Sequence, residues 1–225
     1  MDQEEQEIFV SEEQIPTEEE TPAIQDNLDA LTATEPKKKN SLRKSILTYL
    51  HDFVYLLAVV LLLFLLCFRV VVVSGPSMMD TLEDGDYLLL LGSIFYDDYE
   101  RGDIIVASKD SFRNGEPIVK RVIATEGQTV NIDFVTGVVY VDGVPLQEDY
   151  VRTPTNLYEG VDFPLVVEEN HIFVMGDNRN DSKDSRSPEI GQVDLREVLG
   201  KAIFLIFPGE DESEERNFDR IGVID

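Results

Sequence analysis

The chain has 225 residues, a formal net charge of -26 at pH 7 and a hydrophobic content of 43%. This length allows one ordinary domain with additional segments, and the hydrophobic content is sufficient for a core. Nucleic-acid-binding proteins present basic surfaces to the phosphate backbone, so the acidic balance argues against a nucleic-acid partner. The single cysteine, Cys67, excludes an intramolecular disulfide and a cysteine-based zinc site, and the two histidines, His51 and His171, exclude a histidine-rich metal site.

Much of the negative charge lies in residues 1–36, which contain twelve Asp or Glu residues and no Lys or Arg. Such a segment cannot bury enough apolar surface to offset the entropy of ordering it, so we predict a disordered acidic tail. The sign of the charge then changes in residues 37–45, a short basic collar that contains five Lys or Arg residues.

Residues 46–68 form an apolar run whose main polar interruptions, His51 and Asp52, lie near its start. About 20 apolar residues cross a bilayer core of about 30 Å, so the run predicts a transmembrane helix. It is longer than the apolar region of about 7–15 residues in a cleavable signal peptide, and no small-x-small cleavage site follows it. The positive-inside rule makes the protein a single-pass cell-membrane protein with a cytoplasmic N-terminus and residues 69–225 outside.

The part beyond the anchor is predicted to be mainly β, since short β-branched or aromatic runs bounded by turn residues recur along it. Asp142-Gly143 is a strong hairpin signal, and residues 146–167 indicate a long loop or lid. We expect an extracytoplasmic β-domain over residues 69–208 and an acidic C-terminal tail over residues 209–225. The predicted strands are the valines 70–73 and the runs 86–91, 102–108, 117–126, 128–133, 137–146, 171–177 and 198–207.

Ser77 follows the small turn Ser74-Gly75-Pro76, directly after the valines. A serine hydroxyl is a weak nucleophile until a base takes its proton, and two residues are candidates for that base. One is His171, at the head of a strand-like run, although a histidine there is more often structural. The other is Lys120, which interrupts an apolar run.

Strand alternation places Lys120 on the same face as Ile118 and Val122, and Arg121 on the opposite face. One of the two basic side chains then faces inward, if one face of this sheet is buried. A lysine with an ordinary pKa near 10.4 is neutral in only about one molecule in 2,500 at pH 7. Desolvation can lower such a pKa by several units and so make a usable base, whereas an edge-strand lysine in water would have no such role.

Residues 175–187 are dense in Asp, Asn, Ser and Arg and directly follow an apolar run. They do not fit an EF-hand calcium loop that starts at Asp177, because Arg179, Ser182 and Pro188 stand where a ligand, glycine and glutamate are needed. We interpret the segment as a hydrogen-bonded scaffold beside a functional site, with a merely solvated loop as the alternative.

Four stretches together resemble the successive motif boxes of bacterial type I signal peptidases, in the same order and spacing: "SGPSMMDTL", "RGDIIVAS", "KRVIATEGQ" and "GDNRNDSKDSR". The resemblance covers residues 46–207, and the single N-terminal anchor is similar to the Gram-positive form. It implies a signal-peptidase-like domain of coiled antiparallel sheets. It also implies a serine endopeptidase that uses a Ser/Lys dyad to remove signal peptides from exported preproteins at the outer membrane surface.

By matching position, the resemblance implies Ser77 as the nucleophile, Lys120 as the general base and the Ser77 amide as an oxyanion donor. Some family members carry a hydroxyl two residues before the nucleophile, where this chain has Gly75. Ser182 matches a serine that orients the lysine. Two ion pairs complete the expected support of the site, namely Asp177 with Arg121 and Asp184 with Arg186.

The resemblance also points to positions that line or adjoin small hydrophobic substrate pockets, which here are Met78, Leu82, Ile118 and Val119. Such pockets would explain a preference for small substrate residues at positions -1 and -3 before the cleavage site. Ordinary core packing is the alternative for all four, above all for Leu82. The family usually has proline three residues after the nucleophile, where this chain has Asp80. A carboxylate close to the lysine would favour its protonated form, so we expect Asp80 to point to solvent and activity to survive.

The expected partners are preprotein signal peptides, the lipid bilayer and, in proximity, the secretion translocon; nothing in the sequence requires a metal or organic cofactor. Self-cleaving repressors are similar in this core, but they are soluble and carry a DNA-binding module. A peptidase dedicated to one surface or pilus protein stays open as an alternative. So does an inactive membrane-tethered scaffold, which Asp80 favours and the presence of both Ser77 and Lys120 disfavours.

Overall fold

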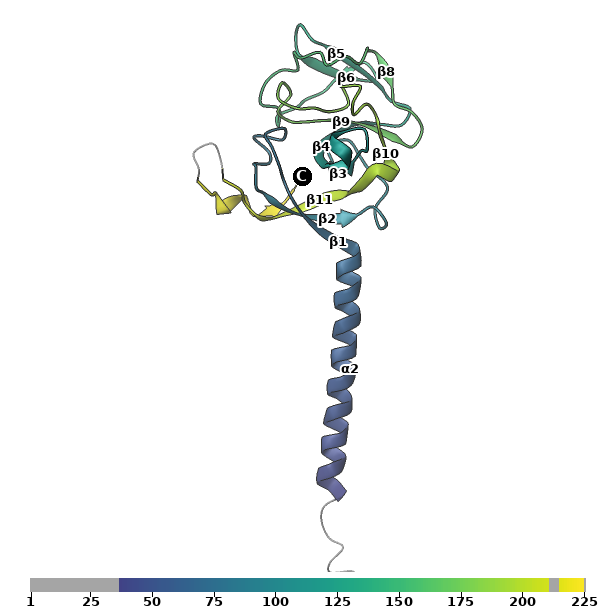
Figure 1. The fold of residues 1–225 in the computed structure, drawn as a ribbon, viewed down its shortest axis with the longest axis vertical. Coiled ribbons are helices and arrows are strands. Elements are labelled where there is room, and N and C mark those ends of the chain that lie inside the picture. Colours follow the sequence, from purple (N-terminus) through teal and green to yellow (C-terminus); the bar gives the residue numbers. More distant parts are fainter. Residues whose placement is uncertain (1–36, 211–214, 225) are drawn as a thin grey trace, which may run out of the picture. The chain divides into compact units, whose positions relative to one another are not determined.

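The computed structural model describes residues 37–210 and 215–224, so the predicted acidic tail of residues 1–36 lies outside the described residues. The chain divides into two compact units, Met1–Leu57 and Ala58–Asp225. Within the described part, one long helix is followed by twelve strands and three short 3-10 turns (Figure 1). The fold is mainly β with antiparallel sheets, as predicted.

The long helix α2 spans Lys37–Cys67 and therefore includes the basic collar as well as the apolar run. Its part Leu42–Cys67 has 26 residues, a mean hydropathy of 2.5 and no buried share, so it is a candidate membrane span. At 1.5 Å per residue these 26 residues measure about 39 Å, more than the bilayer core requires. The helix ends where Phe68 and the β-branched valines begin, since such residues favour strands.

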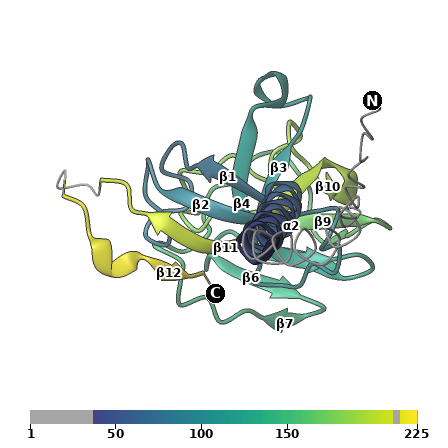
Figure 2. The same cartoon turned by 90° about the horizontal axis from the view of Figure 1, so that it is seen from below.

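The larger sheet runs in the order β1-β2-β11-β3-β4-β9-β10, and β12 pairs with β11 at one side (Figure 2). Neighbouring strands are antiparallel throughout, and register shifts in β4 and β11 mark bulges that increase the local twist. The bounds are β1 Phe68–Val72, β2 Tyr87–Gly92, β3 Ile104–Ser108, β4 Pro117–Thr125, β9 His171–Met175, β10 Val193–Asp194, β11 Val198–Phe207 and β12 Gly222–Val223.

The smaller sheet has the order β7-β6-β5-β8. Its hairpin between β6 and β7 turns at Asp142 and Gly143, whose φ angles of 53° and 76° are both positive, as a type I′ turn requires. The predicted hairpin is therefore confirmed. The bounds are β5 Thr129–Asp133, β6 Val138–Val141, β7 Val144–Pro145 and β8 Leu165–Val166, and the 3-10 turns are η1 Arg113–Gly115, η2 Leu195–Glu197 and η3 Phe218–Arg220.

All the predicted runs contain a strand, but β10 lies outside them and two segments differ from expectation. The predicted loop 146–167 includes the short strand β8, which pairs with β5. The segment 209–225 was expected to be a tail, yet its described part contains η3 and β12, and β12 pairs with β11. The added strands β8 and β12 have two residues each, so they carry no periodic signal in a sequence.

Strand β4 is buried on both faces, because three apolar clusters meet around it. Ile118 and Val122 belong to one cluster, Val119 to a second and Ile123 to a third. The condition of a buried face is therefore met on both sides of the sheet, and both neighbouring basic side chains are enclosed. β4 is also central in the sheet, since β3 and β9 pair with its two edges.

Candidate active site

Ser77 lies in the loop 73–86 that joins β1 to β2. Two backbone hydrogen bonds close the ends of this loop, from the Val73 amide to the Asp86 carbonyl at 2.8 Å and from the Gly85 amide to the Val73 carbonyl at 2.9 Å. The loop is therefore a closed unit anchored at both ends to the sheet, and Ser77 is held half-buried within it.

Gly75 allows the chain to turn just before Ser77. Its φ is 88°, in the left-handed region that residues with a Cβ rarely adopt, and its amide donates to Asp84 Oδ1 at 2.7 Å. A serine at this position would need a strained backbone. The absence of the additional hydroxyl that some family members carry here is thus consistent with the shape of the turn.

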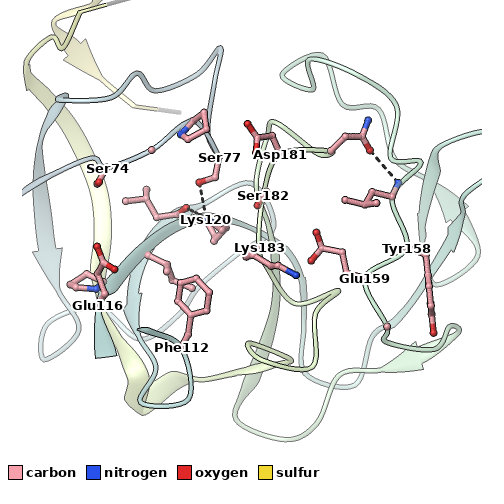
Figure 3. A pocket seen from close by; sticks show the side chains of 18 residues that line it. Ser74, Ser77, Phe112, Glu116, Lys120, Tyr158, Glu159, Asp181, Ser182 and Lys183 are labelled. Atoms are coloured by element: carbon pink, nitrogen blue, oxygen red, sulfur yellow. Dashed lines mark hydrogen bonds between the residues drawn. The ribbon is translucent and has the colours of Figure 1, made fainter. Parts of the chain in front are cut away.

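The side chain of Lys120 extends from β4 to the serine, so that its Nζ lies 2.7 Å from Ser77 Oγ (Figure 3). The same nitrogen donates to the Val119 carbonyl at 2.8 Å. Lys120 is only 3% exposed, so its amine is shielded from water beside the serine hydroxyl. The structure thus brings together the two residues that the resemblance pairs. His171 does not line this cavity, and its Nδ1 lies 2.8 Å from the Glu169 carbonyl.

The pair opens into a cavity of about 700 Å³, within the range of about 300–1,000 Å³ that is usual for ligand sites. Four chain segments and one aromatic side chain form its wall, as Figure 3 shows. The lining residues are 74–77, Phe112, 116–120, 157–160 and 180–183. The predicted loop 146–167 thus contributes part of the wall opposite Ser77.

The residues expected at substrate pockets fall into two groups. Ile118 and Val119 line the cavity. Met78 and Leu82 are outside the cavity lining, with exposures of 0% and 2%, and they pack in a core cluster of the β-domain. These two side chains therefore anchor the loop that carries Ser77 to the apolar core of the β-domain.

Asp177 joins β4 to the serine loop. The expected pairing is present: Arg121 Nη2 lies 2.8 Å from Asp177 Oδ2, and Nε donates to Oδ1 at 2.9 Å. The same carboxylate also accepts from the Thr81 hydroxyl at 2.6 Å. Because Arg121 is adjacent to Lys120 and Thr81 lies four residues after Ser77, this buried carboxylate fixes both halves of the pair.

Asp184 is the centre of the second expected ion pair, with Arg186 Nη2 at 2.7 Å from its Oδ2. The Ser182 hydroxyl and the Gly176 amide donate to that oxygen at 2.9 Å and 3.0 Å. Burial alone would raise the pKa of the Asp184 carboxyl. The hydrogen bonds and charge of Arg186, with the hydrogen bond from the Gly176 amide, instead hold that pKa below its usual range.

The loop 175–187 approaches the serine at Gly176. A Cβ there would lie 2.3 Å from Ser182 Oγ and 2.4 Å from the Ser77 carbonyl oxygen, so only glycine fits. The Asn178 amide donates to that same carbonyl at 3.1 Å. The segment is therefore a hydrogen-bonded scaffold against the loop that carries Ser77, as its composition indicated.

Two further residues of the site, Arg179 and Glu159, were not predicted from the sequence. Arg179 is fully buried, and its guanidinium bonds Glu148 at 2.6 Å and Thr155 at 2.9 Å, which ties the cavity loop 146–167 to the scaffold loop. Glu159 lines the cavity, and its Oε2 is enclosed and meets no hydrogen-bond partner among the residues that the structure describes. Burial raises the pKa of the Glu159 carboxyl, and the charge of Asp184 adds to the effect.

Asp80, which replaces the family's usual proline, points to solvent. Its side chain is 69% exposed, and its Oδ1 lies 3.8 Å from Nη1 of Arg152. The predicted orientation is confirmed, and Asp80 is outside the cavity lining.

A serine beside a buried lysine amine, in an open cavity of an antiparallel β-fold, defines a peptidase class that needs no histidine base. The family model described as signal peptidase, peptidase S26, matches residues 46–207. The chain therefore belongs to the signal peptidase family, peptidase S26, and is a serine endopeptidase, as its motifs predicted.

Two known relatives agree with this assignment. A signal peptidase I of Bacillus licheniformis is 33% identical over 183 residues, which cover 78% of this chain and 95% of the relative. A probable signal peptidase I-1 of Synechocystis is 38% identical over 144 residues, 60% of this chain and 69% of the relative. A crystal structure of a signal peptidase I from Enterococcus faecalis is similar with a TM-score of 0.38 and 35% identity, covering 46% of this chain and 96% of that one.

Proposed function

We propose that this signal peptidase removes N-terminal signal peptides from exported preproteins with Ser77 as the nucleophile and Lys120 as the general base. The observation that carries the proposal is the 2.7 Å separation of Lys120 Nζ and Ser77 Oγ at the wall of the cavity. The intact pair disfavours the inactive-scaffold alternative, and no feature of the cavity favours a single dedicated substrate.

In the proposed reaction, neutral Lys120 accepts the proton of the Ser77 hydroxyl as Oγ attacks the scissile carbonyl carbon. The Ser77 amide donates to the oxyanion of the tetrahedral intermediate. Protonated Lys120 then gives its proton to the departing amine, the new N-terminus of the mature protein. Water, activated by the same lysine, hydrolyses the acyl-enzyme and releases the signal peptide.

Supporting residues would hold this geometry rather than react. Ser182 lines the cavity with Lys120, and its hydroxyl is fixed by a hydrogen bond to Asp184. In that position it would orient the Lys120 amine. Ile118 and Val119 would contact the small residues at -1 and -3 of the substrate, because they are the apolar side chains that line the cavity beside the lysine.

For localisation, we propose that α2 crosses the cell membrane once, with its basic N-terminal end in the cytoplasm and the β-domain outside. The 26-residue apolar span and the collar before it support this topology. Lipid and a nearby secretion translocon would then be the surroundings in which the substrate reaches the enzyme.

The decisive test is cleavage of a preprotein with an A-x-A signal by the purified full chain in liposomes. Ser77→Ala and Lys120→Ala should each lower kcat by at least about 1,000-fold, because each removes one member of a unit that acts together. Ser111→Ala and Lys109→Ala are matched controls outside the cavity and should cleave normally. Mass spectrometry of the product locates the cut. Cleavage at the signal junction by Ser77→Ala would overturn the proposal.

A further inference from the structure

We infer that Arg220, in the C-terminal segment 215–224, is a positioning residue that holds the Ser77 loop in its reactive geometry. The inference rests on the proposed role of Ser77. The family model ends its match at residue 207, so this arginine lies beyond the matched part of the chain.

The first contact is with Asp86, the last residue of the loop 73–86, whose side chain is fully buried. Arg220 donates to both carboxylate oxygens, from Nη2 to Oδ2 at 2.6 Å and from Nη1 to Oδ1 at 3.1 Å. The amides of Glu83 and Gly209 donate to the same carboxylate at 2.8 Å and 2.7 Å. A buried carboxylate is strongly unfavourable without a counter-charge, so Arg220 stabilises this end of the loop.

The second contact reaches into the loop itself, where Nη2 of Arg220 donates to the Thr81 carbonyl at 3.2 Å. The hydroxyl of the same threonine donates to Asp177, which pairs with Arg121 beside the lysine. Thr81 is thus fixed from two sides, by its carbonyl to the C-terminal segment and by its hydroxyl to the β4 network. Polar contacts therefore run from Arg220 through Thr81 and Asp177 to Arg121. Thr81 lies four residues after Ser77, and Arg121 is adjacent to Lys120.

The C-terminal segment is itself fixed to the sheet, so it can act as a support. β12 pairs with β11 in the register Phe204 with Val223 and Leu205 with Gly222. The Asn217 side chain caps η3 by accepting from the Asp219 amide at 2.9 Å. Arg220, at the end of η3, is only about one-fifth exposed and is held between this cap and the strand.

The choice of arginine follows from the geometry. Its planar fork reaches two carboxylate oxygens and a carbonyl at once, which a lysine ammonium does not reproduce. A displacement of the reacting group by about 1 Å is enough to lower a rate about 100-fold. Loss of these contacts should therefore lower the rate of the chemical step rather than substrate binding.

The test compares Arg220→Ala with the wild type as full-length protein in liposomes, using the same A-x-A preprotein. We expect kcat to fall about 10- to 100-fold while KM stays within about 2-fold, because the cavity lining is unchanged. Arg220→Lys should recover only part of the loss, and added guanidinium ion should raise the kcat of Arg220→Ala. Hydrogen exchange should accelerate in the loop 73–86.

Arg216→Ala is the matched control, because Arg216 lies on the same segment but bonds the Pro208 carbonyl at 3.0 Å and Glu210 at 2.7 Å. Its kcat should equal the wild-type value.

Equal kcat in the Arg220→Ala, Arg216→Ala and wild-type proteins, with Ser77→Ala inactive, would overturn the positioning role and leave the proposed function standing. Active Ser77→Ala would instead overturn the proposed function. If Arg220→Ala does not fold, Arg220→Lys decides, since a wild-type kcat in that variant contradicts the need for the fork.

Discussion

Among single residues, Asp80 departs most clearly from its family's pattern, and its surroundings predict a small effect. We expect Asp80→Asn to change kcat/KM by less than about 2-fold, because exposed ion pairs such as the one with Arg152 contribute little. Cleavage assays of wild type and variant at neutral pH measure this directly. A several-fold gain in the variant would mean that the carboxylate acts on Lys120 after all.

Glu159 should make the stability of the protein depend on pH. Burial, with the charge of Asp184, raises the pKa of its carboxyl, so the folded protein retains this proton to higher pH than the unfolded chain does. Ionisation therefore opposes folding, and the cost appears as pH rises from the unfolded pKa of about 4.3 through the higher folded value. Glu159→Gln should raise the free energy of unfolding at pH 7 and leave it unchanged at pH 3.

Chemical denaturation at the two pH values measures the Glu159 effect, with the exposed Glu168→Gln as the control. A variant that is less stable than the wild type at pH 7 would show that the ionised carboxylate has a stabilising partner.

Contacts between residues were predictable from the sequence to different degrees. The Ser77 and Lys120 pair, and the partners of Arg121 and Arg186, followed from the resemblance, because the motif boxes that carry them occur in a known order. The pairing of Arg220 with Asp86 could not be predicted, since 134 residues separate the two and neither belongs to a periodic pattern.

Between elements, the strongest test concerns the junction of β4 with the serine loop. Asp177→Asn keeps the shape of the side chain but leaves the Arg121 guanidinium buried without its counter-charge. Breaking a buried pair in this way costs about 3–5 kcal/mol of folding free energy. Cleavage should fall with it, because the amide offers a single acceptor oxygen to Thr81 and Arg121 together.

Denaturant unfolding and cleavage, measured on the same Asp177→Asn sample, check this expectation. Arg196→Ala is the control, because that side chain is 90% exposed. Unchanged stability in Asp177→Asn would mean that solvent reaches the pair.

Among the secondary-structure elements, the longer strands were predictable because β-branched runs between turn residues are typical of strands. β8, β10 and β12 were not, since a strand of two residues is shorter than any period that a sequence can show. The alternation in β4 gave the directions of Lys120 and Arg121 but not their common burial, which depends on three clusters formed by distant segments.

For the whole molecule, the proposed topology predicts that the β-domain and the N-terminal segment are labelled from opposite sides of the membrane. In a Cys67→Ser background, Val135→Cys lies at a side chain that is 91% exposed on the β-domain. A membrane-impermeant maleimide should label it in intact cells, whereas Ala23→Cys should be labelled only after permeabilisation. The reverse pattern would place the β-domain in the cytoplasm and overturn the topology.

Ten residues along the chain separate Ser77 from Cys67, the last residue of α2. A fully extended chain covers at most about 3.6 Å per residue, so Ser77 lies no more than about 36 Å from the end of the helix. Under the proposed topology, enzyme and anchored substrate share this thin layer. Tethering of this kind raises effective concentration, as it does for linked binding modules. The enzyme therefore needs little affinity for the few residues around its cut, and proteins that lack an anchor are spared because they seldom enter the layer.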